Sequence, residues 1–550
     1  MPSRLRDGCV ASLIAIVLAV ILTWPIAARL GSAGRVDSGD GRHGVWNVAW
    51  VAHTLTTDPT SLFDANIFYP YRQTLAYSEA NIIAGIVAAP VWAATKNPYA
   101  SYNTVVLLAF AGAALSAFLL VRVLGGSQFS ASIAGLMYGF SPYMFSHVPH
   151  IQLLMTFGPP LSLAAMHHFT KAPSLGRGAL LGAALGVTGL ACAYYGIFAG
   201  LATGLGLLWN AIAQRRLRQP RFWLGALMAA GVVVAMVGPF FVPYMAMRDA
   251  GFARSLVEAR LYSTTGPEFL ASAVLVHRWM LPFLGDVRQV LFPGFLSVLL
   301  ALVAVGLAVR TNARHRETTA FYCAVATFAL WLSMGPAAGL YTAFYQVVPV
   351  FSFLRAPVRF GLLVGLSIAV LAAMAITWLE HRHGKLNPWF ASALVVIGLA
   401  ESWVGPLQLA DAPPVAQAYR RLAVMPRAPV AEFPFFTTVS ERHRHTEYML
   451  MSTFHWQPMI NGYSDHIPAD FFADGPALAS FPSPEAWAAL RARGVRWIVV
   501  HFNDYPADVG PVLRPQLQAM PNRLRLVVDE FPVSLYEVIW PMPPSAARQP

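Results

Sequence analysis

Long apolar segments recur along the first three quarters of the chain and constrain its fold more than any other feature. Hydrophobic residues make up 56% of the sequence and charged residues only 12%, about half the charged share of an ordinary soluble domain. The segments long enough to span a bilayer are 9–29, 101–121, 129–147, 151–169, 178–193, 195–213, 222–244, 290–309, 318–335, 358–379 and 388–409. A shorter run, 81–95, is interrupted by Pro90. We therefore expect an all-α polytopic membrane bundle of about eleven spans, with about twelve as the alternative.

Basic residues mark one set of the short loops and predict the orientation. They are Arg4 and Arg6, Arg122, Lys171 and Arg177, Arg215, Arg216, Arg218 and Arg221, Arg310, Arg314 and Arg316, and Arg382 and Lys385. Short loops rich in Lys and Arg face the cytoplasm, so we expect a protein of the cytoplasmic membrane with a cytoplasmic N-terminus. The alternation holds only if 81–95 does not cross. The formal charge of +12 is scattered over these loops, which excludes nucleic acid as a partner.

The composition changes near residue 410, where Pro413 and Pro414 mark a linker. Beyond it, 430–433 and 497–501 are expected to be buried strands, and 524–536 one or two more. A helix is expected from Ser483, as its N-cap, to the stop at Gly494. We predict two parts. Residues 1–410 form the membrane module, with a large first outer loop at 30–100, and residues 411–550 form a small extracytoplasmic α/β domain.

The first outer loop carries the most informative acid. Asp40 lies between two glycines shortly after the first span, and such a turn lets a carboxylate point into a cavity at the membrane surface. Residues 43–57 have helical apolar spacing and fit a helix on the bilayer interface, with Trp46 and Trp50 at headgroup depth. A carboxylate held there fits a general base. An ordinary turn that caps the helix is the alternative.

These features resemble the GT-C superfamily of membrane glycosyltransferases over roughly residues 9–240. The residues that carry the resemblance are Gly39-Asp40 after the first helix, the helix 43–57, Asn66-Ile67-Phe68-Tyr69-Pro70, the basic turn Val121-Arg122 to Gly125, and Ala134-Gly135 to Ser141-Pro142. The last passage is similar to one in protein-mannosyl, aminoarabinose and related bacterial transferases.

The resemblance implies a donor sugar linked to polyprenyl phosphate and an essential acid in the first outer loop. By that analogy Asp40 is the base and Asp37 or Glu79 the second acid, while His43 is a candidate substrate contact. Asp37 and Asp40 are three residues apart and do not form the family's Asp-x-Asp pair. The identity of the second acid therefore stays open, and so does a divalent metal cofactor.

Two arginines mark the outer end of the span that begins near 358. Arg355 and Arg359 are one helical turn apart and are expected to face the same way. Guanidinium groups form forked hydrogen bonds with phosphate oxygens, so we assign this pair, with Arg278 as a weaker candidate, to the donor phosphate. Snorkelling to ordinary headgroups is the alternative.

Polar and aromatic side chains at other outer breaks are further candidates. His150 and Gln152 are expected to bond sugar hydroxyls, although satisfying a helix end is the simpler role. Tyr195 is expected to stack on a sugar or to anchor the interface. In the tail, the groups around His445, His455 and Asn461–His466 fit either a carbohydrate surface or, as we favour, a packed loop.

Together these features predict inverting transfer of a sugar from a polyprenyl-phosphate donor to an envelope glycan, lipid or protein acceptor. The chemistry is expected at the outer membrane face, with membrane lipid as a partner and the oligomeric state left open. A transporter or flippase of a lipid-linked sugar is the leading alternative, although the spans are almost free of the charged groups such proteins use. A non-catalytic receptor or assembly protein is a third hypothesis.

Overall fold

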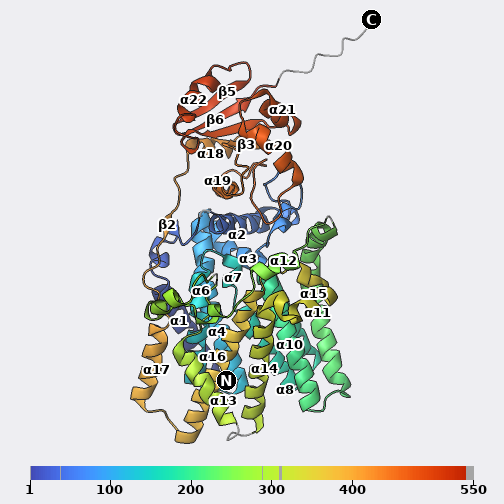
Figure 1. Ribbon diagram of the computed structural model, residues 1–550, viewed down its shortest axis with the longest axis vertical. Coiled ribbons are helices and arrows are strands. Elements are labelled where there is room, and N and C mark those ends of the chain that lie inside the picture. Colours follow the sequence, from blue (N-terminus) through green and yellow to red (C-terminus); the bar gives the residue numbers. More distant parts are fainter. Residues whose placement is uncertain (1, 38, 250, 288, 309–312, 541–550) are drawn as a thin grey trace. The chain divides into compact units, whose positions relative to one another are not determined.

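The computed structural model describes residues 2–37, 39–249, 251–287, 289–308 and 313–540 (Figure 1). The basic residue Arg310 of the orientation prediction lies outside them. The chain divides into two compact units. The first contains Met1–Arg35, Asn81–Val87 and Asn103–Leu409, and the second contains Val36–Ala80, Ala88–Tyr102 and Ala410–Pro550.

Helices build the first unit almost entirely. Their bounds are α1 (Pro2–Leu22), α5 (Gln128–Gly139), α6 (Pro142–Ser146), α7 (Ile151–Leu154), α8 (Gly158–Lys171), α9 (Leu175–Ala191), α10 (Ala193–Ala213), α11 (Pro220–Asp249), α12 (Leu256–Leu261), α13 (Phe295–Leu307), α14 (Ala313–Ser333), α15 (Leu340–Val347), α16 (Gly361–His383) and α17 (Pro388–Ala400). The helices α3 (Ile82–Thr95) and α4 (Pro98–Leu124) contribute to both units. The short strand β1 (Ala33–Gly34) also belongs here.

Among the described residues, four helices are long and apolar enough to cross a bilayer: α4, α10, α11 and the segment Pro357–His383 that contains α16. Shorter apolar helices accompany them at Ile82–Thr95, Leu175–Ala191, Phe295–Leu307 and Pro388–Ala400. These helices support a multi-pass membrane protein. The count of about eleven spans stays a prediction.

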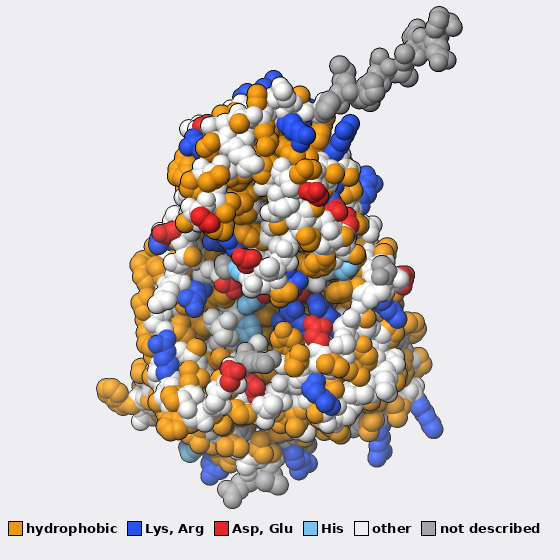
Figure 2. Space-filling model, turned by 45° about the horizontal axis from the view of Figure 1, so that its top comes forward, with side chains coloured by type: hydrophobic (Ala, Val, Ile, Leu, Met, Phe, Trp, Pro, Cys, Tyr) orange, Lys and Arg blue, Asp and Glu red, His pale blue; other side chains and the backbone are white. Residues whose placement is uncertain are grey.

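Burial separates central helices from peripheral ones within the first unit. The apolar window of α16 is 78% buried, and this helix packs on α5, α13 and α14. The window of α11 is only 11% buried, and its Leu227 and Val234 are exposed. Apolar side chains also cover much of the face seen in Figure 2. An exposed apolar helix surface of this kind is suited to lipid rather than water.

Small residues allow α9 and α11 to approach closely. A Cβ atom at Gly178 would collide with the backbone of Gly225, and one at Gly182 with the backbone of Ala229. The spacing of four residues places both glycines on one face of α9. This is the packing expected of membrane helices, where van der Waals contact rather than the hydrophobic effect holds helices together.

Two expected spans are broken in the structure. The segment 129–147 is divided into α5 and the short α6, and 151–169 into α7 and α8. The first break lies at Ser141-Pro142 and the second precedes Gly158-Pro159-Pro160. Proline lacks a backbone donor and disfavours helix in the residue before it, which explains both breaks.

The second unit contains a four-stranded mixed sheet in the order β3-β4-β6-β5. Its strands are β3 (Val430–Phe433), β4 (Trp497–His501), β5 (Leu524–Glu530) and β6 (Val533–Val538). The pair β3 and β4 is parallel, with Val430 opposite Trp497, and the other pairs are antiparallel. These elements confirm the strands predicted from the sequence. The helices of this part are α18 (Gln417–Leu422), α19 (His445–Ser452), α20 (Ala469–Ala479), α21 (Pro484–Ala492) and α22 (Gly510–Gln518), and a short strand β2 covers Ala410–Asp411.

The predicted helix at 483–493 is confirmed in its caps as well. The Ser483 hydroxyl accepts a hydrogen bond from the Ala486 backbone N–H at 3.2 Å, and Gly494 follows the helix with a φ of +62°. A residue in this left-handed conformation commonly ends a helix, and glycine adopts it without steric cost.

Residues 36–80, predicted as part of the first outer loop, fold with the C-terminal residues. Its helix α2 (Asp40–Thr57) packs on α19, and the Tyr69 backbone N–H donates to the Met459 carbonyl at 2.8 Å. The expected headgroup position of Trp46 and Trp50 is wrong. Both rings are buried inside this unit, where their N–H groups donate to Asn66 and to the Leu62 carbonyl.

Candidate active site

Asp40 is the first residue of α2. This residue is exposed in the first turn of the helix, where a negative charge is favoured by the helix dipole. The Asp37 carboxylate accepts hydrogen bonds from the backbone N–H groups of Gly39 at 3.1 Å and Gly41 at 2.7 Å. Asp37 therefore satisfies backbone donors at the start of the helix, and Asp40 is held in a defined turn.

A tyrosine from the C-terminal part contacts Asp40. The Tyr463 hydroxyl donates to the Asp40 carboxylate at 3.4 Å. Burial, and then the nearby charges of Asp40 and Asp465, raise the pKa of Tyr463 to about 12. The hydroxyl thus keeps its proton at neutral pH and remains a donor. Tyr463 belongs to the tail cluster of the sequence, and nothing in the local pattern indicates its distant partner Asp40.

His43 lies one turn further along α2. Its ring centroid is 6.3 Å from that of Tyr463 and 5.5 Å from that of Trp46. Burial lowers the pKa of His43, and the carboxylates of Asp40 and Asp465 only partly oppose this effect. The imidazole is therefore neutral near pH 7. The structure brings the predicted residues Asp40 and His43 together around Tyr463.

Glu79, the other predicted acid, is half-buried in the same unit. Its backbone carbonyl accepts a hydrogen bond from the Asn47 side chain of α2 at 3.1 Å. The neighbouring Ser78 hydroxyl donates to Asp465 at 3.4 Å. Asp37 and Glu79 both lie beside α2, and the choice between them as the second acid stays a prediction.

Arg355 and Arg359 both contact Tyr194 in the first unit. The Arg359 guanidinium lies over the Tyr194 ring at 4.5 Å, and the Arg355 backbone N–H donates to the Tyr194 hydroxyl at 2.8 Å. The Arg355 guanidinium lies over the Tyr262 ring at 5.3 Å. The two arginines do not share one helical turn as expected. Arg355 precedes the 3-10 helix Pro357–Phe360 that contains Arg359, because Pro357 starts a new element.

The Arg359 side chain is the more available of the two for a ligand. Its Nε is buried and has no hydrogen-bond partner among the described residues. A buried charged donor without an acceptor is costly, so an oxygen-rich anion beside it would be stabilising. Arg278 is placed differently. It is exposed on the 3-10 helix Leu275–Phe283, and its Nε donates to the Ala273 carbonyl at 3.2 Å.

His147 bonds the local backbone and one distant side chain. His147 has its Nδ1 2.8 Å from the Tyr143 carbonyl and its Nε2 3.1 Å from the Gln289 amide oxygen. His150 precedes α7, which carries Gln152, and both side chains are half-buried. Within the part of the chain that the structure describes, no group of three or more His, Cys, Asp and Glu side chains is arranged for a metal ion.

Tyr195 is fully buried and its hydroxyl is already used. It donates to the Leu153 carbonyl at 2.7 Å and is 2.9 Å from the Tyr143 hydroxyl. Its neighbour Tyr194 is the tyrosine that contacts the arginines. The sequence places two adjacent tyrosines at the start of α10, and only the direction of that helix decides which ring faces which neighbour.

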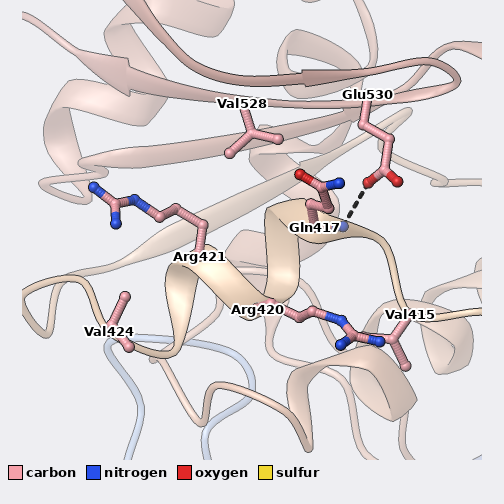
Figure 3. Close-up of a pocket in the computed structure, with 7 residues that line it drawn as sticks. All are labelled: Val415, Gln417, Arg420, Arg421, Val424, Val528 and Glu530. Atoms are coloured by element: carbon pink, nitrogen blue, oxygen red, sulfur yellow. Dashed lines mark hydrogen bonds between the residues drawn. The ribbon is translucent and has the colours of Figure 1, made fainter.

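Part of the tail cluster is packed inside the second unit, whereas its Asp465 is exposed. His445 and Asn461 are fully buried, and His455 is nearly so. The second unit also carries an open cavity of about 640 Å³, lined by Val415, Gln417, Arg420, Arg421, Val424, Val528 and Glu530 (Figure 3). The guanidinium groups of Arg420 and Arg421 point apart in Figure 3, so they do not gather on one ligand.

Comparison with known proteins identifies similar solved structures. No protein-family model and no curated protein matches the chain. It is similar to the oligosaccharyltransferase AglB of Archaeoglobus fulgidus in complex with an inhibitory peptide and a dolichol-phosphate, with a TM-score of 0.45 and 14% identity over 91% of this chain and 69% of that one. It is also similar to an oligosaccharyltransferase of the same organism tethered to an acceptor peptide, with a TM-score of 0.48 and 12% identity over the same shares.

Proposed function

We propose that this protein transfers a sugar from a polyprenyl-phosphate donor to a hydroxyl acceptor at the outer face of the cytoplasmic membrane. The observation that carries the proposal is the exposed Asp40 carboxylate in the first turn of α2, in a turn that Asp37 holds and next to the protonated Tyr463. A carboxylate of this kind takes the proton of an acceptor hydroxyl as the new bond forms.

The proposed step inverts the anomeric carbon. The acceptor oxygen attacks that carbon while its proton passes to Asp40, and the bond between the carbon and the phosphate oxygen breaks. Polyprenyl phosphate leaves with the bonding electron pair. Arg355 and Arg359 would stabilise the charge that develops on the phosphate. The buried and unpaired Nε of Arg359 supports this role.

The remaining predicted residues have supporting roles in the proposal. His43 is neutral and close to Tyr463, so it would bond acceptor or sugar hydroxyls rather than carry charge. Asp37 or Glu79 serves as the second acid. Asp40 belongs to the second unit and the arginine pair to the first, so their action on one donor molecule is part of the proposal.

Replacing the base tests the proposal directly. Membranes that contain the protein supply the lipid-linked donors, and incorporation of radiolabelled hexose into glycan, lipid and protein is measured. Asp40→Asn should lower transfer by about 100-fold or more, the usual contribution of a general base. Asp58→Asn is the matched control. Asp58 lies at the other end of α2, where its carboxylate accepts hydrogen bonds from the hydroxyls of Thr60 and Ser61.

A second experiment tests whether Arg359 binds the donor. Arg359→Gln should raise the donor concentration needed for half-maximal transfer, while Arg382→Gln, near the opposite end of the same helical segment, should not. Full transfer by the Asp40→Asn variant would show that Asp40 is not the base. Movement of the lipid-linked sugar across sealed vesicles without a covalent product would instead favour the flippase.

A further inference from the structure

A cavity of about 240 Å³ lies where four helix ends of the first unit meet. Leu124 and Lys171 are the last residues of α4 and α8, Gln214 caps α10, and Glu317 is near the start of α14. The helix α10 packs on both α8 and α14, and all three are labelled in Figure 1. The cavity has about eight times the volume that one water molecule occupies in the liquid.

The lining of the cavity includes apolar groups and an unused donor. Leu124, Phe321 and Trp209 are among the lining residues, and the rings of Trp209 and Phe321 have centroids 6.1 Å apart. The indole Nε1 of Trp209 is buried without a hydrogen-bond partner among the described residues. A buried N–H without an acceptor loses its hydration, so a ligand oxygen in the cavity would restore the missing hydrogen bond.

The lining residues carry both charge signs. Lys171 is exposed, and its ammonium donates to the Val123 carbonyl at the end of α4. Glu317 is half-buried and forms no ion pair with any cation that the structure describes. The Arg216 guanidinium donates to the Thr170 carbonyl. A ligand with one phosphate and one cationic group would satisfy this arrangement better than a simple anion.

We propose that this cavity binds the headgroup of an ethanolamine phospholipid. The phosphate oxygens accept from the Trp209 N–H and lie near Lys171, and the ammonium donates to the Glu317 carboxylate. Basic pockets between membrane helices are suited to phospholipid headgroups. Glu317 adds selectivity, because a trimethylated choline headgroup has no N–H to donate to it. This site is separate from the proposed transfer reaction.

The test measures thermal unfolding of the purified full-length protein in phosphatidylcholine discs, with or without phosphatidylethanolamine or phosphatidylglycerol. Phosphatidylethanolamine should raise the unfolding temperature by several degrees and more than phosphatidylglycerol does. Glu317→Gln should abolish this preference. Trp209→Phe, which keeps the ring but removes the N–H, should reduce the effect of both lipids by at least half.

Trp223→Phe is the matched control, because the Trp223 N–H already donates to the Leu217 carbonyl at 2.9 Å. It should keep the full preference for phosphatidylethanolamine. An unchanged preference in Glu317→Gln, or no effect of phosphatidylethanolamine on the unaltered protein, would overturn the proposal. If soluble phosphoethanolamine in detergent produced the same shift, the ligand would be a water-soluble phosphate ester and not a lipid. This result would also overturn the proposal.

Discussion

At the scale of single residues, the turn before α2 leaves no room for a side chain at position 41. A Cβ atom on Gly41 would lie 2.8 Å from the Val36 Cα and 2.9 Å from its Cβ. The Gly41 N–H is also the closer of the two donors to Asp37. The position of the Asp40 carboxylate therefore depends on having glycine at position 41.

Gly41→Ala should shift this turn and reduce sugar transfer by roughly 10- to 100-fold, because displacing a reacting group by about an ångström has an effect of that size. Transfer is measured in the membrane assay. Gly204→Ala on α10 is the control, since a methyl group there meets no atom within 4 Å. Equal activity of the two variants would show that the turn does not position the reacting group.

Buried histidines make the second unit sensitive to acid. Burial lowers the pKa of His445 to about 4 and that of His455 to about 3. Both fall below the ordinary value of 6.5, so the unfolded chain binds these protons first. The stability from each neutral histidine is present above pH 6.5 and is lost as the pH falls toward the folded pKa, by up to about 1.4 kcal/mol per pH unit.

The free energy of unfolding of the second unit should therefore decrease from pH 6.5 to pH 4. Chemical denaturation of the intact protein at several pH values measures this dependence. His455→Phe should reduce this pH dependence by the contribution of one proton. An identical slope in His455→Phe and the unaltered protein would contradict the assignment.

At the scale of elements, Asn66 connects three segments of the second unit. It is 3% exposed, and its side-chain oxygen accepts from the Trp46 indole at 3.2 Å. Its amide nitrogen donates to the Ser452 hydroxyl at 3.0 Å and to the Gln457 carbonyl at 3.1 Å. The Asn66 amide thereby joins its own segment to α2 and to the end of α19.

Asn66→Ala should lower the free energy of unfolding of this unit by about 2–4 kcal/mol, since it leaves several buried polar groups without partners. Denaturation monitored by tryptophan fluorescence is suited to the measurement, because Trp46 and Trp50 lie in this region. Asn522→Ala, in an exposed turn before β5, should change stability by less than about 0.5 kcal/mol. A similar small change at Asn66 would contradict its linking role.

At the scale of the whole molecule, cysteine labelling tests the predicted orientation in the membrane. In a variant without Cys9, Cys192 and Cys323, we introduce one cysteine by Val439→Cys and, separately, one by Gly176→Cys. Val439 is exposed in the second unit, and Gly176 is exposed in the first turn of α9, next to Arg177. If Lys and Arg mark the cytoplasmic side, a membrane-impermeant thiol reagent should label residue 439 in intact cells and residue 176 only after permeabilisation. The reverse pattern would invert the topology.

The sequence predicted many of the helices and the strands, but not the contacts between distant segments. Apolar runs and caps placed α4, α10, α16 and α21 well because these signals are local. Breaks at Ser141-Pro142 and before Gly158 shortened two expected spans. Partners such as Tyr463 for Asp40, or Asn461 for Glu432, lie far apart in the sequence, and no local pattern encodes them.

By itself, the sequence determined that lipid surrounds much of this chain and that a mixed sheet follows residue 410, because hydrophobic periodicity and turn residues act over short distances. Only the tertiary structure decided that α2 buries its tryptophans within the second unit, that Tyr194 rather than Tyr195 contacts the arginines, and that Asp37 holds the turn before Asp40. Those outcomes depend on which helix faces and loop atoms meet, and packing of the whole chain selects them.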